Sequence, residues 1–287
     1  MGTPSQLSIT SSFKKISKFS APVRILLFIG VLSFLWLPLA LPIYWLLRED
    51  NNLATILTMT LLFIELLFFW RFWGKSVHSE AKIYVRYGLT RNNKNIAEFA
   101  KGLTIGFWFC LSLFIVEAFL GWLKVVASPS LPIVTEGLLS AVGIGLAEEL
   151  LFRGWLLDEL QRDYGRLASI YFSAGIFAVA HFLKPIEEII RTAVTFPALL
   201  LLGIALVLAK YRHGDRLGIS IGIHSGLVWG YYIVNVGQII EYTSEVPAWV
   251  TGIDGNPIAG VTGLIFLTGL ILIASNFFSK TSDREKY

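Results

Sequence analysis

Repeated apolar runs of membrane-spanning length are the feature that most constrains this sequence. The first run, Ile25 to Leu47, is ~23 residues long, whereas about 20 apolar residues suffice for a helix to cross a bilayer. It is also longer than the apolar core of a cleaved signal peptide. The sequence therefore predicts an all-α, polytopic membrane protein with about eight transmembrane helices. The seven further runs lie at about 53–73, 103–126, 137–160, 167–183, 192–209, 217–236 and 258–278.

The composition agrees with this class and excludes others. Hydrophobic residues make up 55% of the chain and charged residues 15%, whereas soluble domains average about 25% charged residues. A single cysteine, Cys110, excludes a disulfide framework and a cysteine-based metal site. Basic residues fall mainly between the apolar runs, and no basic groove with interleaved aromatic residues appears. We therefore expect the lipid bilayer, and not a nucleic acid, as the partner of this basic charge.

The distribution of Lys and Arg predicts an orientation in the membrane. Summed over alternate segments between the predicted spans, one side carries 19 of these residues and the other side carries 3. The positive-inside rule then places both termini in the cytoplasm, and we expect a bacterial or thylakoid-type membrane. The predicted segments are a cytoplasmic polar tail (1–24), N-terminal transmembrane helices with a basic loop at 74–102 (25–130), a core with polar residues (131–236), and an acidic outer loop, last transmembrane helix and cytoplasmic tail (237–287).

Three charged residues interrupt the fourth apolar run, in the segment Ala147 to Arg153. Each isolated charge costs at least ~2.5–3.5 kcal/mol at the centre of a membrane helix, so the cluster needs compensation. Glu149 and Arg153 are four residues apart and lie on one helix face, where they can pair. Glu148 is turned about 100° away and lacks that partner. This pattern favours an intramembrane polar site in which Glu148 is available for chemistry over a patch that only joins helices.

Two of the four histidines, His181 and His224, fall within or at the end of apolar runs. His78 and His213 fall in predicted loops, where a solvated side chain is expected. Two imidazoles with a carboxylate are a hydrolytic zinc set, so Glu148, His181 and His224 are candidate ligands for Zn²⁺ or another divalent metal. Glu148 could instead act as a general base. Helix rise spreads the three over ~10 Å of depth, so a tilt or a shifted boundary must bring them together.

The run that carries His224 also carries glycines at every fourth position. These are Gly218, Gly222, Gly226 and Gly230, and such a ridge allows a second helix to approach closely. His224 is two residues from Gly222 and therefore projects roughly opposite the ridge. One face of this helix is predicted to pack, and the other to present the histidine.

Taken together, Glu148-Glu149-x-x-x-Arg153, Phe177-x-x-x-His181 and His224 resemble the motif series of the CPBP intramembrane protease family. This family includes the type II CAAX prenyl endopeptidases and the bacterial Abi, or bacteriocin-immunity, proteins. The resemblance covers about 137–230 and identifies 131–236 as a catalytic core. It implies cleavage of a membrane-associated peptide or protein, with a prenylated C-terminal tail as one substrate, by a water that Glu148 activates.

The resemblance also implies roles for the other motif residues. Glu149 and Arg153 would hold the helix geometry, while His181 and His224 would bind or polarise the water, with a metal ion or as oxyanion stabilisers. One position departs from the family pattern, because Val228 stands where the family often has Asn four residues after the last histidine. Asn235 lies on the same face but ~16 Å further along the helix, too far to replace it.

Three other functions stay open at this level. Gly218-Ile219-Ser220-Ile221-Gly222 matches the Gly-x-Ser-x-Gly pattern of serine hydrolases, although that motif needs a strand–turn–helix context. Glu65 and Glu117, inside the second and third runs, could join Glu148 in a proton-coupled transporter, although hydrogen bonding between helices is the preferred interpretation for both. Val228 also leaves room for a catalytically silent partner or immunity protein.

Overall fold

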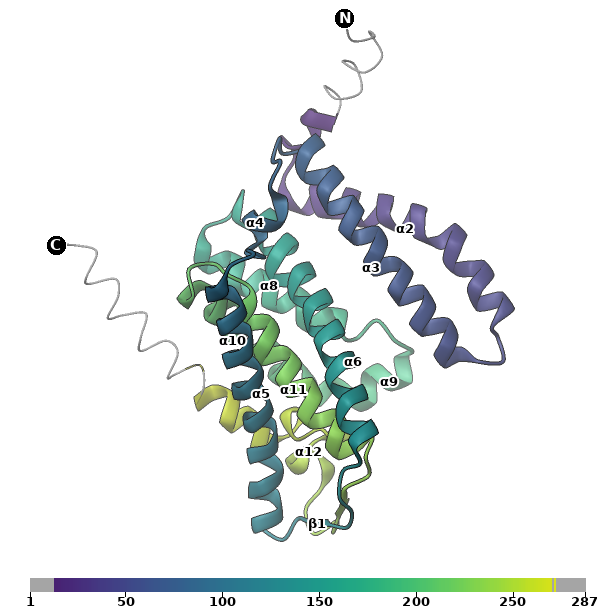
Figure 1. Cartoon of the computed structure of the whole chain (residues 1–287), viewed down its shortest axis with the longest axis vertical. Helices are drawn as coiled ribbons and strands as arrows, with labels where there is room; N and C mark the ends of the chain where they lie inside the picture. Colours follow the sequence, from purple (N-terminus) through teal and green to yellow (C-terminus); the bar gives the residue numbers. More distant parts are fainter. Residues whose placement is uncertain (1–12, 270, 272–287) are drawn as a thin grey trace, which may run out of the picture. The chain divides into compact units, whose positions relative to one another are not determined.

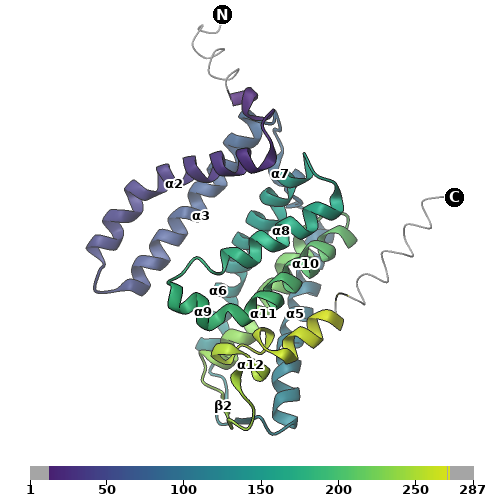
Figure 2. The ribbon, with the colours of Figure 1, turned by 180° about the vertical axis from the view of Figure 1, so that it is seen from behind.

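The computed structural model describes residues 13–269 and 271, and most of them are helical. Figures 1 and 2 show the helices from opposite sides. The chain forms two compact units. Unit 1 consists of Met1–Arg86 and Asp158–Tyr164, and unit 2 consists of Tyr87–Leu157 and Gly165–Tyr287. The division of the chain at 24, 130 and 236 stays a prediction.

Unit 1 is built on the helical hairpin of α2 (Ala21–Leu46) and α3 (Asn51–Ser76), followed by the short α4 (Ile83–Tyr87), whose last residue belongs to unit 2. The Asp50 side chain accepts a hydrogen bond from the backbone N–H of Leu53 and so caps α3. Many large apolar side chains of the hairpin point outward, which suits a hydrocarbon solvent and not water.

A buried carboxylate ties the parts of unit 1 together. Glu159 lies in α7 (Leu157–Gln161) and accepts hydrogen bonds from Arg24 at 2.8 Å and from Trp73 at 2.9 Å. His78 Nε2 lies 2.6 Å from the same carboxylate, and the His78 side chain is only 3% exposed. The expectation of a solvated His78 is therefore wrong, because the buried carboxylate, donated by a segment distant in sequence, holds the imidazole.

Unit 2 contains the polar residues of the predicted core. α11 (Gly218–Asn235) packs against α5 (Asn93–Phe119) and α6 (Leu131–Glu149), while α10 (Phe196–Arg212) packs against α8 (Arg166–Ala180). α8 and α10 lie behind α11 in Figure 1 and in front of it in Figure 2.

The glycine ridge of α11 faces α5, as predicted. A Cβ atom added at Gly222 would lie 2.2 Å from the carbonyl oxygen of Phe99, and one at Gly226 would lie 2.3 Å from that of Leu103. The contact is reciprocal, because a Cβ at Gly106 of α5 would lie 2.1 Å from the carbonyl oxygen of Ile223. The two backbones are therefore close enough that only glycine fits between them.

Among residues 13–269 and 271, five helices, and not eight, are long and apolar enough to cross a membrane. They are Ala21–Leu46, Asn51–Ser76, Asn93–Phe119, Leu131–Gln161 and Ile186–Arg212. The predicted span 167–183 is α8, which has only 15 residues. The span 217–236 is α11, whose polar and glycine residues lower its hydropathy. The span 258–278 is helical over 261–269 and otherwise extends outside the described residues. The protein is an all-α membrane protein, but the count of eight is not supported.

Short elements connect the long helices. The predicted basic loop at 74–102 is shorter than expected, since α5 begins at Asn93. Two three-residue strands, β1 (Leu123–Val125) and β2 (Ile240–Tyr242), pair antiparallel. A π-helical turn, η1 (Leu150–Leu156), continues α6. The remaining elements are α9 (Ile186–Thr192), η2 (Ala193–Thr195), α12 (Ala248–Thr251), η3 (Ile253–Gly255) and η4 (Pro257–Ala259).

Candidate functional site

The predicted pair of Glu149 and Arg153 is present and completely buried. Glu149 is the last residue of α6, and Arg153 lies in the π-helical turn η1. Arg153 Nη1 donates to Glu149 Oε1 at 2.9 Å, and both side chains are 0% exposed. Removal of one partner from such a pair leaves an uncompensated charge, so each residue requires the other.

The π-helical turn is fixed by side chains from α8 and α10. Ser173 Oγ donates to the carbonyl oxygen of Phe152 at 3.1 Å, and Lys210 Nζ donates to that of Arg153 at 2.5 Å. Arg153 Nη2 also reaches the carbonyl oxygen of Gly203 at 3.3 Å. π-Helical turns recur at functional sites because the wider turn changes the direction of side chains. Here the turn begins directly after the two carboxylates.

His224 lies between the two neighbouring carboxylates. Its Nδ1 is 2.9 Å from Glu149 Oε1, and its Nε2 is 3.8 Å from Glu148 Oε2. Glu149 Oε1 already accepts from Arg153, so it serves as an acceptor and His224 Nδ1 must be the donor. In the neutral imidazole this tautomer leaves a lone pair on Nε2, directed at Glu148.

Glu148 makes no hydrogen bond with the described residues, whereas Glu149 is engaged at Oε1 by Arg153 and His224 and has a buried Oε2 without a partner among them. The Oε2 atom of Glu148 is also buried, while its side chain as a whole is 32% exposed. The distance of 3.8 Å to His224 is too long for a direct hydrogen bond. The carboxylate that the sequence predicts to be free is therefore next to the imidazole but not bonded to it.

Phe177 connects the second histidine to this cluster. His181 directly follows α8, and its Nδ1 donates to the carbonyl oxygen of Phe177 at 2.8 Å, which again leaves the lone pair on Nε2. The Phe177 ring is 4.6 Å from the His181 ring and 6.3 Å from the His224 ring, measured between centroids. The guanidinium carbon of Arg153 lies 4.2 Å from the centroid of the same ring. The Phe177 ring therefore covers the His181 imidazole, one helical turn further along the chain.

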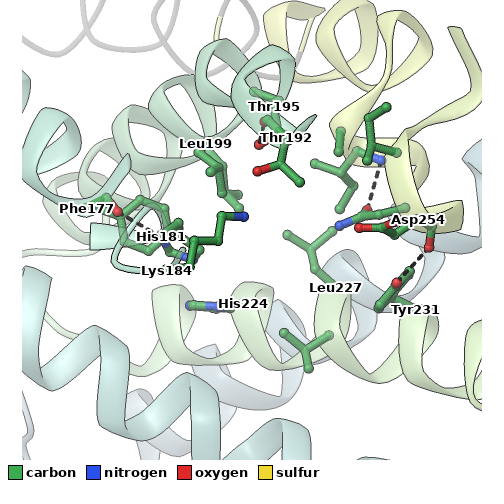
Figure 3. A pocket seen from close by; sticks show the side chains of 17 residues that line it. Phe177, His181, Lys184, Thr192, Thr195, Leu199, His224, Leu227, Tyr231 and Asp254 are labelled. Atoms are coloured by element: carbon green, nitrogen blue, oxygen red, sulfur yellow. Dashed lines mark hydrogen bonds between the residues drawn. The ribbon is translucent and has the colours of Figure 1, made fainter. Parts of the chain in front are cut away.

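A cavity of about 300 Å³ opens beside the two imidazoles (Figure 3). His181 and His224 both line it, whereas Glu148 is not among the described residues that do so. Leu199, Leu202 and Leu227 contribute apolar surface to it. The structure therefore brings His181 and His224 to one cavity, and places Glu148 beside His224 but outside the cavity lining.

Several polar residues of this cavity have no counterpart in the prediction. The missed residues are Lys184, Thr192, Thr195, Asp254 and Asn256. Lys184 is only three residues after His181, so its closeness to the motif could have indicated that it lies at the same site. Figure 3 shows the Lys184 side chain extending into the cavity and Asp254 on its far side. Asp254 belongs to the predicted acidic outer loop, residues 237–257, for which the sequence predicts no part in the site.

Asp254 fixes the segment that covers the far side of the cavity. Arg191 of α9 donates to both of its carboxylate oxygens, at 2.6 and 3.0 Å, and this hydrogen-bonded pair holds the pKa of Asp254 below its usual value. The Asp254 carbonyl accepts from Tyr231 at 3.0 Å and from Asn235 at 3.1 Å. Asn235 therefore binds the backbone of this segment and does not replace the family Asn. Val228, which stands at the family position, lines the cavity.

Three further polar residues, Ser220, Glu117 and His213, make hydrogen bonds outside the cavity lining. Ser220 Oγ is buried within helix α11 and donates to the carbonyl oxygen of Leu206 at 2.9 Å, so it lacks the strand–turn–helix setting of a nucleophile elbow. Glu117 accepts from Thr262 at 2.9 Å and Tyr242 at 3.3 Å, in agreement with the preferred interpretation, whereas Glu65 Oε2 is buried and makes no hydrogen bond with the described residues. His213 Nδ1 donates to the carbonyl oxygen of Ala209 at 2.9 Å.

The donor set bears on the expected metal ion. No group of three or more His, Cys, Asp or Glu side chains among residues 13–269 and 271 is arranged to hold a metal. Arg153 and His224 engage Oε1 of Glu149, and the predicted ligand set would use Glu148 Oε2 and the Nε2 atoms of His181 and His224. These three do not form a ready site, and a metal held by Glu148, His181 and His224 stays a prediction.

Comparison with protein-family models gives one match that contains all of these motif residues. Residues 129–230 match the model described as type II CAAX prenyl endopeptidase Rce1-like. The match begins just before α6 and ends within α11. Comparisons with curated proteins and with solved structures give no match.

Proposed function

We propose that this chain, which belongs to the CAAX prenyl endopeptidase family through residues 129–230, is an intramembrane peptidase whose general base is Glu148. One observation carries the proposal. Glu149 is engaged at Oε1 by Arg153 and His224, whereas Glu148 makes no hydrogen bond with the described residues and its buried Oε2 lies 3.8 Å from His224 Nε2. A site with one neutralised and one free carboxylate can hold and deprotonate a water molecule.

The proposed mechanism gives each residue a separate task. A water molecule donates one hydrogen bond to Glu148 and one to the lone pair of His224 Nε2, which directs its oxygen toward the scissile carbonyl carbon. As the C–O bond forms, Glu148 takes the proton, and it returns this proton to the leaving amine nitrogen when the C–N bond breaks. His181 faces the same cavity and contacts the substrate on the side opposite Glu148. Glu149 and Arg153 position His224 and do not touch the substrate.

The proposed substrate is a peptide segment of a membrane-associated protein. The cavity combines an apolar wall of leucines with polar groups from Lys184, Thr192 and Asn256. Such a surface suits an extended backbone whose side chains are apolar, as in a C-terminal tail near the membrane. A lipidated tail is the substrate that the family suggests.

The test is a cleavage assay on the purified, full-length protein in lipid nanodiscs, with a library of lipidated and unlipidated peptides. Glu148→Gln is expected to lower the cleavage rate by ~10²–10⁴-fold, the usual contribution of a general base. Glu136→Gln, the same substitution on α6 at an exposed position, is the matched control and should retain full activity. Equal activity of Glu148→Gln and wild type would refute the proposal. Loss of activity in Ser220→Ala, with Glu148→Gln active, would favour the serine mechanism.

The metal assignment has its own test. If Glu148, His181 and His224 bind a divalent ion, purified wild-type protein should retain about one equivalent of metal by elemental analysis, and His181→Ala/His224→Ala should lose it. If the wild-type protein contains no stoichiometric metal and a chelator does not affect cleavage, the water is activated by the protein groups alone.

A further inference from the structure

A second cavity, distinct from the one beside the histidines, lies between α5, α10 and α11. Its volume is about 210 Å³. Most of its lining is apolar, and three basic residues complete it: Lys101 of α5, and Arg212 and His213 at the end of α10. None of these three residues has a role in the proposed peptidase.

The basic residues and the deepest apolar residues lie at opposite ends of this cavity. α5 and α11 begin, and α10 ends, at the same side of unit 2, where Lys101, Arg212 and Ile219 line the cavity. Phe109 and Leu227 line it ~12 Å further along their helices, eight residues beyond Lys101 and Ile219 respectively. The cavity is therefore amphipathic along its length, with positive charge at one end only.

Two carboxylates of the described residues near the basic end, those of Glu98 and Asp215, pair with arginines outside the cavity. Glu98, one helical turn before Lys101, accepts both hydrogen bonds that Arg216 donates, one of them at 2.8 Å. Asp215 pairs with Arg166 at 3.0 Å. Three basic side chains line this end of the cavity, and these two carboxylates are not among its lining residues, so the end is complementary to an anion.

We propose that this cavity binds one anionic phospholipid, with its headgroup phosphate at Lys101, Arg212 and His213 and an acyl chain along Ile105, Phe109 and Leu206. The basic end coincides with the helix ends that the Lys and Arg distribution places at the cytoplasmic interface, where lipid headgroups lie. Basic pockets between transmembrane helices suit anionic headgroups, and the apolar wall suits the chain. Leu202 and Leu227 line both cavities, so the lipid would lie next to the proposed active site.

The test is native mass spectrometry of the full-length protein, titrated with dioleoyl phosphatidylglycerol or dioleoyl phosphatidylcholine. Wild type should retain one phosphatidylglycerol molecule more tightly than phosphatidylcholine. Lys101→Gln/Arg212→Gln should weaken phosphatidylglycerol binding by about 30-fold, since each charge near a membrane surface contributes about fivefold. The matched control is Arg91→Gln/Lys94→Gln, which removes two exposed basic residues near the same end and should bind like wild type.

A second variant separates the acyl chain from the headgroup. Ala209→Phe places a ring in the cavity and should prevent retention of the lipid while both basic residues are intact. Equal retention of the two lipids by wild type, or equal losses in both double variants, would overturn the proposal. Competition by sn-glycerol 3-phosphate at the same concentration would also overturn it in favour of a soluble-anion site. Binding is measured without cleavage, so this outcome is independent of the proposed peptidase.

Discussion

The Nδ1 atom of His224 lies 2.9 Å from Oε1 of Glu149, across the interface between α11 and α6. This carboxylate also accepts a hydrogen bond from Arg153. One oxygen thus fixes the tautomer of an imidazole and neutralises a buried cation. The relationship explains why two adjacent glutamates have different surroundings: Glu149 supports His224, and Glu148 stays available.

The buried pair predicts strongly non-additive stability. Arg153→Met and Glu149→Leu should each lower the free energy of unfolding by ~3–5 kcal/mol, because each leaves one buried charge without its partner. The double variant Glu149→Leu/Arg153→Met should be much more stable than the sum of the two losses implies. Thermal unfolding in nanodiscs measures all three variants against wild type.

Cleavage by the double variant separates stability from positioning. It should stay far below wild type even where the double variant is folded, because His224 Nδ1 has lost its acceptor. Wild-type cleavage by the folded double variant would show that Glu149 is not needed to position His224. Additive losses of stability would show that the two charges are not coupled.

The close approach of α5 and α11 predicts a difference between two glycine substitutions. Gly226→Ala should destabilise the protein, since the new Cβ would lie 2.3 Å from the Leu103 carbonyl oxygen and 2.5 Å from the Phe107 nitrogen. Gly143→Ala, in α6, is the matched control because an added Cβ would meet no atom within 4 Å beyond its own stretch of helix backbone. The control should be neutral or slightly stabilising, by up to ~1 kcal/mol from helix propensity. Equal melting temperatures for both variants would contradict this packing.

The Asp254–Arg191 pair predicts a pH dependence at the far side of the cavity. The pKa of Asp254 is lowered by Arg191, so the pair stabilises the fold fully above the unfolded-state value of about 3.9. This stabilisation is lost as the pH falls through the lower, folded-state pKa. Asp254→Asn lacks it at every pH. The difference in melting temperature between wild type and Asp254→Asn should therefore be constant near pH 6 and shrink below about pH 4.

Two comparisons strengthen this measurement. Glu188→Gln removes the other carboxylate that contacts Arg191, at 2.5 Å, and should retain the Asp254 contribution. Hydrogen exchange at residues 252–260 should increase in Asp254→Asn, because its side chain links this segment to α9. A difference in melting temperature that is unchanged down to pH 3 would show that the ion pair does not stabilise the folded protein.

The local part of the site could be predicted from the sequence because it depends on helix geometry. Residues four apart share a face, which gives the Glu149–Arg153 pair, the Phe177–His181 contact and the glycine ridge opposite His224. The Glu149–His224 hydrogen bond joins segments 75 residues apart, so periodicity contains no information about it. The same limit applies to His78, whose carboxylate partner Glu159 lies 81 residues further along the chain.

The number of spans could not be predicted because apolar runs do not distinguish buried helices from helices that face lipid. α8 is apolar but has only 15 residues. α11 contains several glycine, serine and histidine residues, which serve helix packing and the site and lower its hydropathy. The π-helical turn after Glu149 could not be predicted either, because the i+4 spacing of Glu149 and Arg153 fits a regular α-helix equally well.

The predicted orientation can be tested with single cysteines, because Cys110 is completely buried and should not react. Lys94 lies at the basic end of unit 2 and Glu245 lies in the acidic segment, and both are exposed. A membrane-impermeant maleimide should label Glu245→Cys in intact cells, and should label Lys94→Cys only after permeabilisation. The reverse pattern would invert the topology that the Lys and Arg count predicts. Labelling of both variants in intact cells would place both ends of α11 on one side of the membrane and refute the crossing of unit 2.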